Sequence, residues 1–294
     1  MIAMHELTKK FSSGRGIFDL SLTVEEGEVF GFVGPNGAGK STTIRHLMGF
    51  LRADSGWAEI DGVRCWEKSA QVQRRVGYLP GEMGFLEDMT GSQFLDLLAG
   101  MRKLRHLEQR TRLMERFELD PTTPIRKMSK GTKQKVGIVA AFMHSPPVLI
   151  LDEPTSGLDP LMQQRFLELV EEEKQRGTTI FMSSHIFSEV ERICDRVGIL
   201  KDGRLVALQD INSLREMQRK VFRVTTADGL NGDELNIPGC RVVGTHGNEV
   251  DIEVRGNYNG FIGALSTRDI QALDMRPLDL EQIFMHFYPG KEAH

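Results

Sequence analysis

Residues 34–41 read GPNGAGKS, and this stretch constrains the fold of the chain more than any other. It fits the pattern G-x-x-x-x-G-K-[ST], in which glycines let successive backbone N–H groups converge on phosphate oxygens. VFGFV, residues 29–33, precedes it and is typical of a buried strand, whereas the following TTIRHLMGFL is typical of a helix. A strand, a glycine-rich loop and a helix in this order predict a phosphate site at the positive end of the helix.

The side chains of this loop have expected tasks. Lys40 would place a positive charge at the β- and γ-phosphates, and the Ser41 hydroxyl would face Mg²⁺. A glycine turn with an incidental lysine is the alternative, but the flanking strand and helix favour the phosphate site. The other expected nucleotide contacts from this segment are Gly34, Asn36, Gly37, Ala38, Gly39 and Thr42.

The composition is that of a globular protein with one large or two modest domains. The chain has 294 residues, 40% of them apolar and 27% charged, and its net charge of -4 gives no bulk electrostatic case for binding nucleic acid. No apolar run approaches the roughly 20 residues that span a bilayer, and no signal peptide begins the chain. Three widely spaced cysteines form no metal-binding pattern, which favours inert thiols in a reducing cytoplasm.

Strands and helices alternate over the first two thirds of the chain, which predicts a mainly parallel, layered α/β core. VLILD, residues 148–152, is an apolar run without alternation, as expected for a strand that is covered on both faces. Residues 82–144 are mostly helical, with a break near Pro121 and Pro124. The other expected strands are Trp57–Ile60, Arg75–Leu79, Thr178–Ser183 and Val197–Leu200, and further helices are Leu161–Arg176 and Ser188–Asp195.

The pattern changes near Asn212, where SLREMQRK reads as a short polar helix or a linker. Beyond it lie alternating stretches, a short helix near Phe261, a strand near Ile270 and a helix that ends in LEQIFMHFY. We therefore expect a small α+β domain over about residues 220–294, after a larger domain over residues 1–212.

Three polar side chains follow predicted strands of the larger domain. Asp152 closes VLILD and fits an outer ligand of Mg²⁺, and the adjacent Glu153 could orient and polarise an attacking water. His185 follows the strand that ends in MSS and could reach a γ-phosphate at the carboxyl edge of the sheet. A surface acid for Glu153 and a packed histidine for His185 are the alternatives.

These motifs, in this order, resemble those of the ATP-binding subunit of an ABC transporter over about residues 1–212. GPNGAGKST resembles the Walker A loop, VLILDEP the Walker B strand with its catalytic glutamate, and SSH the switch-histidine loop. SGLD resembles the D-loop, and MSKGT stands where the family carries its LSGGQ signature. The resemblance implies a P-loop NTPase fold: a RecA-like core, an antiparallel β subdomain and a helical signature subdomain over about residues 82–147.

The resemblance also implies a head-to-tail dimer of ATPase subunits, in which each ATP and its Mg²⁺ lie between one Walker A loop and the partner's signature. Ser129 keeps the signature hydroxyl and Gly131 the close backbone approach, whereas Lys130 and Thr132 depart from the usual glycine and glutamine. Asp159 of the D-loop is a further expected nucleotide contact. A solvated basic turn is the alternative for MSKGT.

Two other positions depart from the family pattern. Phe11 stands where the family usually has a tyrosine that stacks on adenine; a phenylalanine in the core is the alternative. Gly81 aligns with the glutamine that usually links nucleotide and membrane partner, and Glu82, which follows it, is a candidate contact to metal or water.

The end of the chain favours one branch of the family. PLDLEQIFMHFY resembles the tail of ATPase subunits of ABC-2 type exporters for drugs, antibiotics, lipids or polysaccharides. Leu280, Ile283, Phe284 and Phe287 have the spacing of one apolar helix face. The expectation is a homodimer that uses ATP and Mg²⁺, held at the cytoplasmic face of the membrane by a separate ABC-2 permease.

Two other functions fit part of the pattern. One is a soluble ABC ATPase that acts on nucleic acid or ribosomes, and the other is a nucleotide-gated regulator. The basic stretch RKLRHLEQRTR, residues 102–112, lacks interleaved aromatic residues and reads as a solvated helix face, so no nucleic-acid partner is expected.

Overall fold

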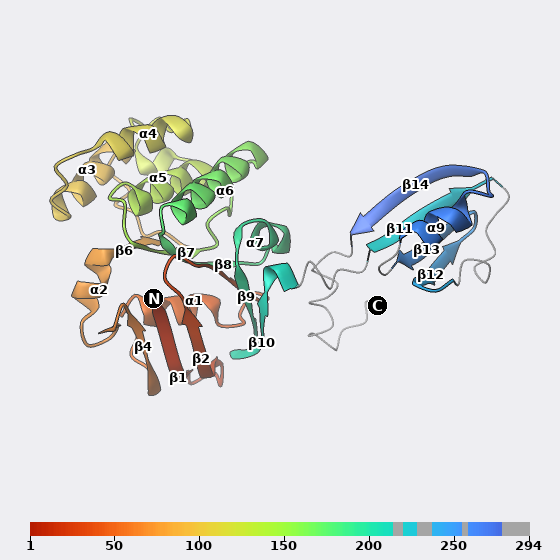
Figure 1. Ribbon diagram of the computed structural model, residues 1–294. Coiled ribbons are helices and arrows are strands. Elements are labelled where there is room, and N and C mark those ends of the chain that lie inside the picture. The colour runs from red at the N-terminus through yellow and green to blue at the C-terminus, as the bar shows by residue number, and fades with distance from the viewer. Residues whose placement is uncertain (214–219, 228–236, 255–257, 278–294) are drawn as a thin grey trace. The chain divides into compact units, whose positions relative to one another are not determined.

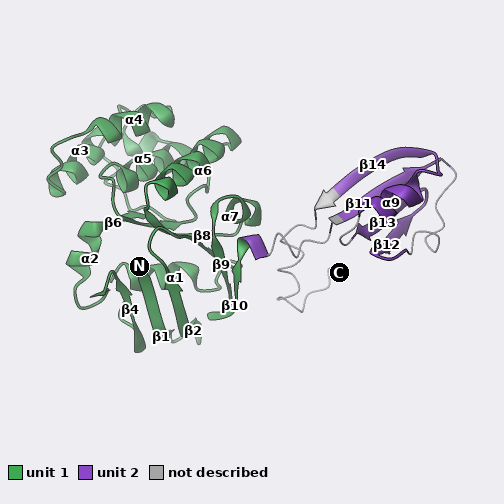
Figure 2. Ribbon diagram, viewed as in Figure 1, with its two compact units in different colours: residues 1–211 green, residues 212–294 purple. Residues whose placement is uncertain are grey.

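The computed structural model describes residues 1–213, 220–227, 237–254 and 258–277. The chain divides into two compact units, a core unit of residues 1–211 and a C-terminal unit of residues 212–294 (Figure 2). Each unit has its own sheet and its own hydrophobic cluster, so each is described by itself. None of the helices in the described residues is both long and apolar enough to cross a bilayer.

A six-stranded sheet forms the centre of the core unit (Figure 1). Its order is β10 (Arg204–Asp210), β9 (Arg196–Lys201), β3 (Val29–Val33), β8 (Thr179–Ser184), β7 (Val148–Asp152) and β6 (Val76–Leu79). The strands from β9 to β6 are parallel, and β10 runs antiparallel to β9. Every residue of β3, β7 and β8 is buried, which explains why their sequences do not alternate. The predicted α/β core is confirmed.

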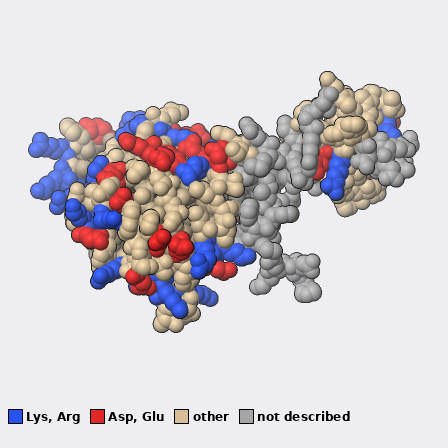
Figure 3. All heavy atoms as spheres, turned by 60° about the horizontal axis from the view of Figure 1, so that its bottom comes forward, with Lys and Arg blue, Asp and Glu red and all other residues tan. Residues whose placement is uncertain are grey.

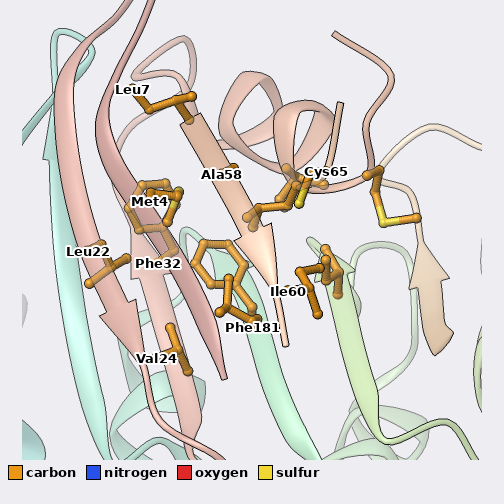
Figure 4. Packing of buried hydrophobic residues seen from close by; sticks show 14 of the residues in the cluster. Met4, Leu7, Leu22, Val24, Phe32, Ala58, Ile60, Cys65 and Phe181 are labelled. Carbon is orange, nitrogen blue, oxygen red and sulfur yellow. The ribbon is translucent and has the colours of Figure 1, made fainter. Parts of the chain in front are cut away.

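A second, antiparallel sheet packs its apolar face against this centre. Its order is β2 (Gly16–Val24), β1 (Ile2–Lys10), β4 (Ser55–Ile60) and β5 (Val63–Arg64). Met4 and Leu22 of this sheet share one buried cluster with Phe32 and Phe181 of the central sheet (Figure 4). The cluster fixes the strand β3 from which the glycine-rich loop departs, because Phe32 lies two residues before Gly34.

A group of helices lies at the end of the core unit away from the antiparallel sheet (Figure 1). It contains α3 (Gly91–Met101), α4 (Glu108–Arg116), the 3-10 turn Ile125–Lys127 and α5 (Lys130–Phe142), and α6 (Pro160–Gln175) follows β7. Thr90 and Gln93 form a capping box at the start of α3. The shorter helices α1 (Lys40–Leu47), α2 (Ser69–Arg75) and α7 (Phe187–Ile193) complete the unit.

Two helix predictions need correction. The helix after the glycine-rich loop ends at Leu47 rather than Leu51, because Gly49 adopts a φ of 67° and turns the chain away. The prediction of one solvated helix face over residues 102–112 is wrong. Arg102 begins the connection between α3 and α4 and donates to the carbonyl oxygen of Val76 at 3.0 Å, and Arg110 is buried beside Asp96.

The C-terminal unit contains a four-stranded antiparallel sheet and a helix that packs on it. The strand order is β12 (Cys240–His246), β13 (Glu249–Val254), β11 (Lys220–Thr226) and β14 (Ile270–Pro277). Phe261 and Leu265 of α9 (Tyr258–Leu265) pack on Val224 and Ile252 of the sheet. The apolar helix predicted from Leu280, Ile283, Phe284 and Phe287 lies outside the described residues, as does most of SLREMQRK.

All three cysteines are buried free thiols. Burial raises the pKa of the Cys65 thiol to about 12 and also raises the pKa of Cys194 and Cys240. Because the thiolate is the reactive form, these side chains act as small apolar groups of the packing.

His144, just after α5, should make the core unit sensitive to acid. Burial, and then the positive charge of Arg102, lower the pKa of His144 from 6.5 to about 4. The unfolded chain therefore binds this proton first as pH falls, and stability decreases between about pH 6.5 and 4, by at most about 3 kcal/mol. We expect His144→Leu to flatten this decrease, as measured by urea unfolding at pH 7.5 and 5. The exposed His106→Leu is the control, and an unchanged pH dependence in His144→Leu would contradict the assignment.

Candidate functional site

The candidate site lies at the carboxyl ends of three neighbouring parallel strands. Gly34 follows β3, Asp152 ends β7, and His185 follows β8. Because β3 pairs with β8 and β8 pairs with β7, the ends of these strands lie side by side. In a parallel α/β sheet this edge is where ligands bind.

Backbone geometry explains the glycines of the loop. Gly37 and Gly39 have φ values of 83° and 113°, which L-residues with a side chain rarely adopt. A Cβ on Gly39 would lie 2.8 Å from Cγ2 of Ile17, and one on Gly34 would lie 2.4 Å from the carbonyl oxygen of Leu200. The loop is therefore a shape that only glycine can build at these positions, and it leads directly into α1.

Lys40 and Glu153 meet behind this loop. The Lys40 side chain is 6% exposed; its Nζ donates to the carbonyl oxygen of Gly34 at 2.6 Å and lies 3.2 Å from Oε1 of Glu153. The second carboxylate oxygen of Glu153, Oε2, lies 2.5 Å from Nδ1 of His185. A cation, a carboxylate and an imidazole predicted from three separate segments thus form one cluster. We name Lys40, Glu153 and His185 the edge triad.

The carboxylate of Glu153 is aimed by its own backbone. Glu153 has a φ of 49°, in the left-handed region that a residue with a side chain enters at an energetic cost. Its N–H donates both to the carbonyl oxygen of Ser183 at 3.2 Å and to the Ser183 hydroxyl at 3.0 Å. These bonds hold the strained turn that directs the side chain to Lys40 and His185.

Asp152 lies just beside this turn and is 4% exposed. The Ser183 hydroxyl donates to Oδ1 of Asp152 at 2.5 Å. A Cβ on Gly81 would lie 3.3 Å from Oδ2 of Asp152, and Glu82, the next residue, is exposed. A buried carboxylate at the carboxyl end of β7 is an oxygen donor that suits a hard cation.

The remaining residues of the loop differ in exposure. Ser41 is exposed on the first turn of α1, and Thr42 is half-buried beside it. Asn36 and Gly37 are exposed at the turn, and Ala38 is buried. The exposed backbone of this turn is open to an anion.

A pocket of about 240 Å³ adjoins the outer side of the loop. Phe18 is the aromatic side chain in its lining, and the loop contributes Asn36, Gly37 and Ala38. Phe11 is 38% exposed in the turn after β1, where its N–H donates to the carbonyl oxygen of Arg15 at 2.8 Å. Phe11 is therefore an aromatic side chain at the surface, and the alternative of a core phenylalanine is wrong.

The signature-like segment starts α5. The Ser129 hydroxyl accepts from the N–H of Thr132 at 3.1 Å and so caps the helix. Lys130 donates to the Ser156 hydroxyl at 2.9 Å, and a Cβ on Gly131 would lie 2.5 Å from the carbonyl oxygen of Gly157. The start of α5 therefore packs against the loop that follows β7 in the same chain.

Asp159 has an identifiable structural task. Its side chain accepts from the N–H of Met162 at 3.0 Å and caps α6, which has Pro160 at its first position. A helix cap alone accounts for an aspartate at this position.

Two buried polar residues of the site had not been predicted. Ser183 connects Asp152 to the backbone of Glu153, and Gln134 donates to the carbonyl oxygen of Pro154 at 2.7 Å. Gln134 is 2% exposed on α5, so it ties the signature helix to the turn after Glu153. A polar residue just before the apolar run VGIVAAF was the signal available for Gln134.

Charged side chains of both signs occur across the face of the core unit shown in Figure 3.

Comparison with known proteins relates the geometry to one family. The family model described as ABC transporter matches residues 17–156. The ABC transporter ATP-binding protein YtrB of Bacillus subtilis (strain 168) is 31% identical over 293 residues, which cover 99% of both chains. The bacitracin transport ATP-binding protein BcrA of Bacillus licheniformis is 36% identical over 78% of this chain and 76% of its own. A solved structure described as the dimeric structure of MJ0796, a bacterial ABC transporter cassette, superposes with a TM-score of 0.66 at 20% identity, covering 72% of this chain and 99% of its own.

Proposed function

Because the chain belongs to the ABC transporter family as an ATP-binding ATPase subunit, we propose that it powers an ABC-2 type exporter through a separate membrane permease. The edge triad carries the proposal. It places one buried cation and one carboxylate at the end of the glycine-rich loop, where the phosphates of a nucleotide would lie.

Each member of the edge triad has a chemical role in this proposal. Lys40 binds the β- and γ-phosphate oxygens and leaves its present partners, Glu153 and the carbonyl oxygen of Gly34. Glu153, once released from Lys40, accepts a proton from the attacking water. His185, 2.5 Å from Glu153, positions that carboxylate and reaches the γ-phosphate. Phe11 stacks on the adenine, and Asn36, Gly37, Ala38, Gly39 and Thr42 of the loop line the nucleotide.

Mg²⁺ fits the donors present. Asp152 offers a buried carboxylate, and Ser41 offers an exposed hydroxyl on the first turn of α1. Both are oxygen donors of the kind Mg²⁺ prefers, and the ion, when bound, supplies positive charge to the phosphate oxygens. Glu82 is exposed next to Gly81, which has no side chain, so we propose that Glu82 contacts the ion or a water bound to it.

The proposed active state is a dimer in which the start of α5 binds the partner's ATP. Ser129 and the backbone of Gly131 would contact the γ-phosphate, and Lys130 would add a positive charge there once it leaves Ser156. Asp159 would approach the same interface from the start of α6. Every motif of a composite site is present in this chain, which supports a homodimer.

The relatives support export as the direction of transport. BcrA is a bacitracin transport ATP-binding protein, and its similarity extends over 78% of this chain. The C-terminal end of the chain resembles the same branch. We therefore propose an antibiotic, drug or lipid as cargo and a position at the cytoplasmic face of the membrane, held there by the permease.

Co-purification tests this proposal. Tagged Glu153→Gln protein is expressed in its native host, and the membranes are solubilised in mild detergent with ATP and Mg²⁺. We expect mass spectrometry to identify a polytopic membrane protein at near-equal stoichiometry. Lys40→Ala, which should bind ATP more weakly, is the matched control and should recover less of that partner. Recovery from the soluble fraction with ribosomal or nucleic-acid partners would overturn the exporter proposal.

A further inference from the structure

Glu189 is a buried acid that the proposed chemistry does not use. It lies in the first turn of α7, three residues beyond the Ile186 that precedes the helix, and it is 6% exposed. A carboxylate without solvent is costly unless hydrogen bonds compensate it. Burial raises the pKa of Glu189, although hydroxyl hydrogen bonds oppose this change.

Two hydroxyl groups from different loops meet this carboxylate. The Thr155 hydroxyl donates to Oε2 of Glu189 at 2.9 Å, and the Ser184 hydroxyl donates to the same oxygen at 3.3 Å. Thr155 and Ser184 are 3% and 1% exposed, so neither hydroxyl can exchange its partner for bulk water. One carboxylate oxygen thus holds together the loop after β7 and the end of β8.

These two segments also carry the two residues of the proposed catalytic pair, Glu153 and His185. Thr155 lies two residues after Glu153, and Ser184 immediately precedes His185. The contact between Oε2 of Glu153 and Nδ1 of His185 is 2.5 Å, although the His185 side chain is 53% exposed. Little packing surrounds this imidazole, so its position depends on the backbone at Ser184.

We propose that Glu189 is a positioning residue that fixes His185 relative to Glu153 by joining Thr155 and Ser184. The inference rests on the roles proposed above for Glu153 and His185. It extends the site from the edge triad to a buried residue on α7.

Loss of this carboxylate should slow turnover and leave nucleotide binding unchanged. We expect Glu189→Ala to lower kcat about 10- to 100-fold, the scale on which a small misplacement of catalytic groups acts. The KM for ATP should stay near that of the wild type, because Lys40 and the loop do not contact Glu189. Glu189→Gln keeps an oxygen that accepts from both hydroxyls and should restore most of kcat.

Glu173 supplies the matched control. It is 2% exposed and accepts a hydrogen bond from the Thr178 hydroxyl at 3.0 Å, so it too is a buried acid bonded to a threonine. Thr178 immediately precedes β8, whereas Ser184 is the last residue of β8. Glu173 therefore lies at the amino end of this strand, away from the end that carries Ser184. If Glu173→Ala lowers stability but leaves kcat unchanged, a general effect of losing a buried acid is excluded.

A double-mutant cycle with His185→Ala separates positioning from mere stability. If Glu189 acts through His185, Glu189→Ala should slow the His185→Ala enzyme little further. The inference would be overturned if the double variant lost kcat by the product of the two single-variant factors. It would also be overturned if Glu189→Ala had the kcat of the wild type. Wild-type turnover in both Glu153→Gln and His185→Ala would instead overturn the proposed site, so the two failures are distinguishable.

Discussion

Glu153→Gln should lose about 10²-fold or more in steady-state ATP turnover while it retains ATP binding. Glutamine has the size of glutamate and keeps an oxygen acceptor for Nζ of Lys40, which lies 3.2 Å from Oε1 of Glu153. It cannot accept a proton from water at neutral pH, and that contribution of a positioned base is worth roughly 10² to 10⁴ in rate. Phosphate release measures the turnover, and equilibrium dialysis with labelled ATP measures the binding.

Glu172→Gln is the control for this variant. Glu172 is a more exposed carboxylate on α6, 2.8 Å from Nη1 of Arg116, and it lies outside the edge triad. It should keep wild-type turnover. Near-normal turnover in Glu153→Gln would remove Glu153 from the role of base, and loss of ATP binding in that variant would show that Glu153 acts in holding the nucleotide.

Lys40→Ala should weaken ATP binding by roughly 10- to 100-fold, which corresponds to the loss of a charge-assisted hydrogen bond to phosphate. The buried Nζ is preorganised, since the carbonyl oxygen of Gly34 at 2.6 Å holds it within the curve of the loop. Alanine removes the charge and leaves Glu153 without its cation, which should also raise the repulsion between that carboxylate and the phosphates. Titration calorimetry with ATP measures the effect.

Lys174→Ala provides the comparison for Lys40→Ala. Lys174 pairs with Asp195 at 2.5 Å, and Asp195 accepts from the N–H of Val29, at the start of β3 rather than at its end. Loss of this cation should leave ATP affinity unchanged. If Lys40→Ala binds ATP as tightly as the wild type, the loop is not a phosphate site.

The strands and the loop that hold the nucleotide were predictable, because their signals are local. VFGFV and VLILD are short apolar runs, and the observed β3 and β7 begin and end where these runs do. The loop needs glycine at fixed positions, and its φ values show why. Signals of this kind lie within a few consecutive residues, so they can be read from the sequence without knowledge of tertiary contacts.

Two strands of the core unit, β1 and β10, gave weaker signals and were missed. β1 has irregular pairing between Met4 and Leu7, and Glu6 in that interval has a φ of 46°, so its apolar residues do not alternate regularly. β10 is an edge strand that alternates between exposed and half-buried residues and has no fully buried one. In neither strand do apolar and polar residues alternate regularly along the sequence, although the burial of β10 does alternate.

The edge triad could be predicted as a set of residues but not as a geometry. Lys40, Glu153 and His185 stand in three motifs, yet only the order of β3, β8 and β7 brings them within hydrogen-bonding distance. Glu189 was missed because a glutamate on a short helix is ordinarily a solvated residue. Its burial depends on hydroxyl groups from two other segments, and their approach is a tertiary property.

The close approach of Gly131 to Gly157 has a consequence for cooperativity. No side chain separates these two backbones, and Lys130 and Gln134 bind the same loop that begins with Glu153. In the proposed dimer, the helix start that grips one ATP would therefore be joined to the turn that carries the base for the other. Binding of ATP at either site would therefore change the ATP affinity of the other site, and by linkage the change in binding free energy would be the same in both directions. Such a dimer would respond to ATP with a Hill coefficient above one, and the two hydrolysis events would not be independent.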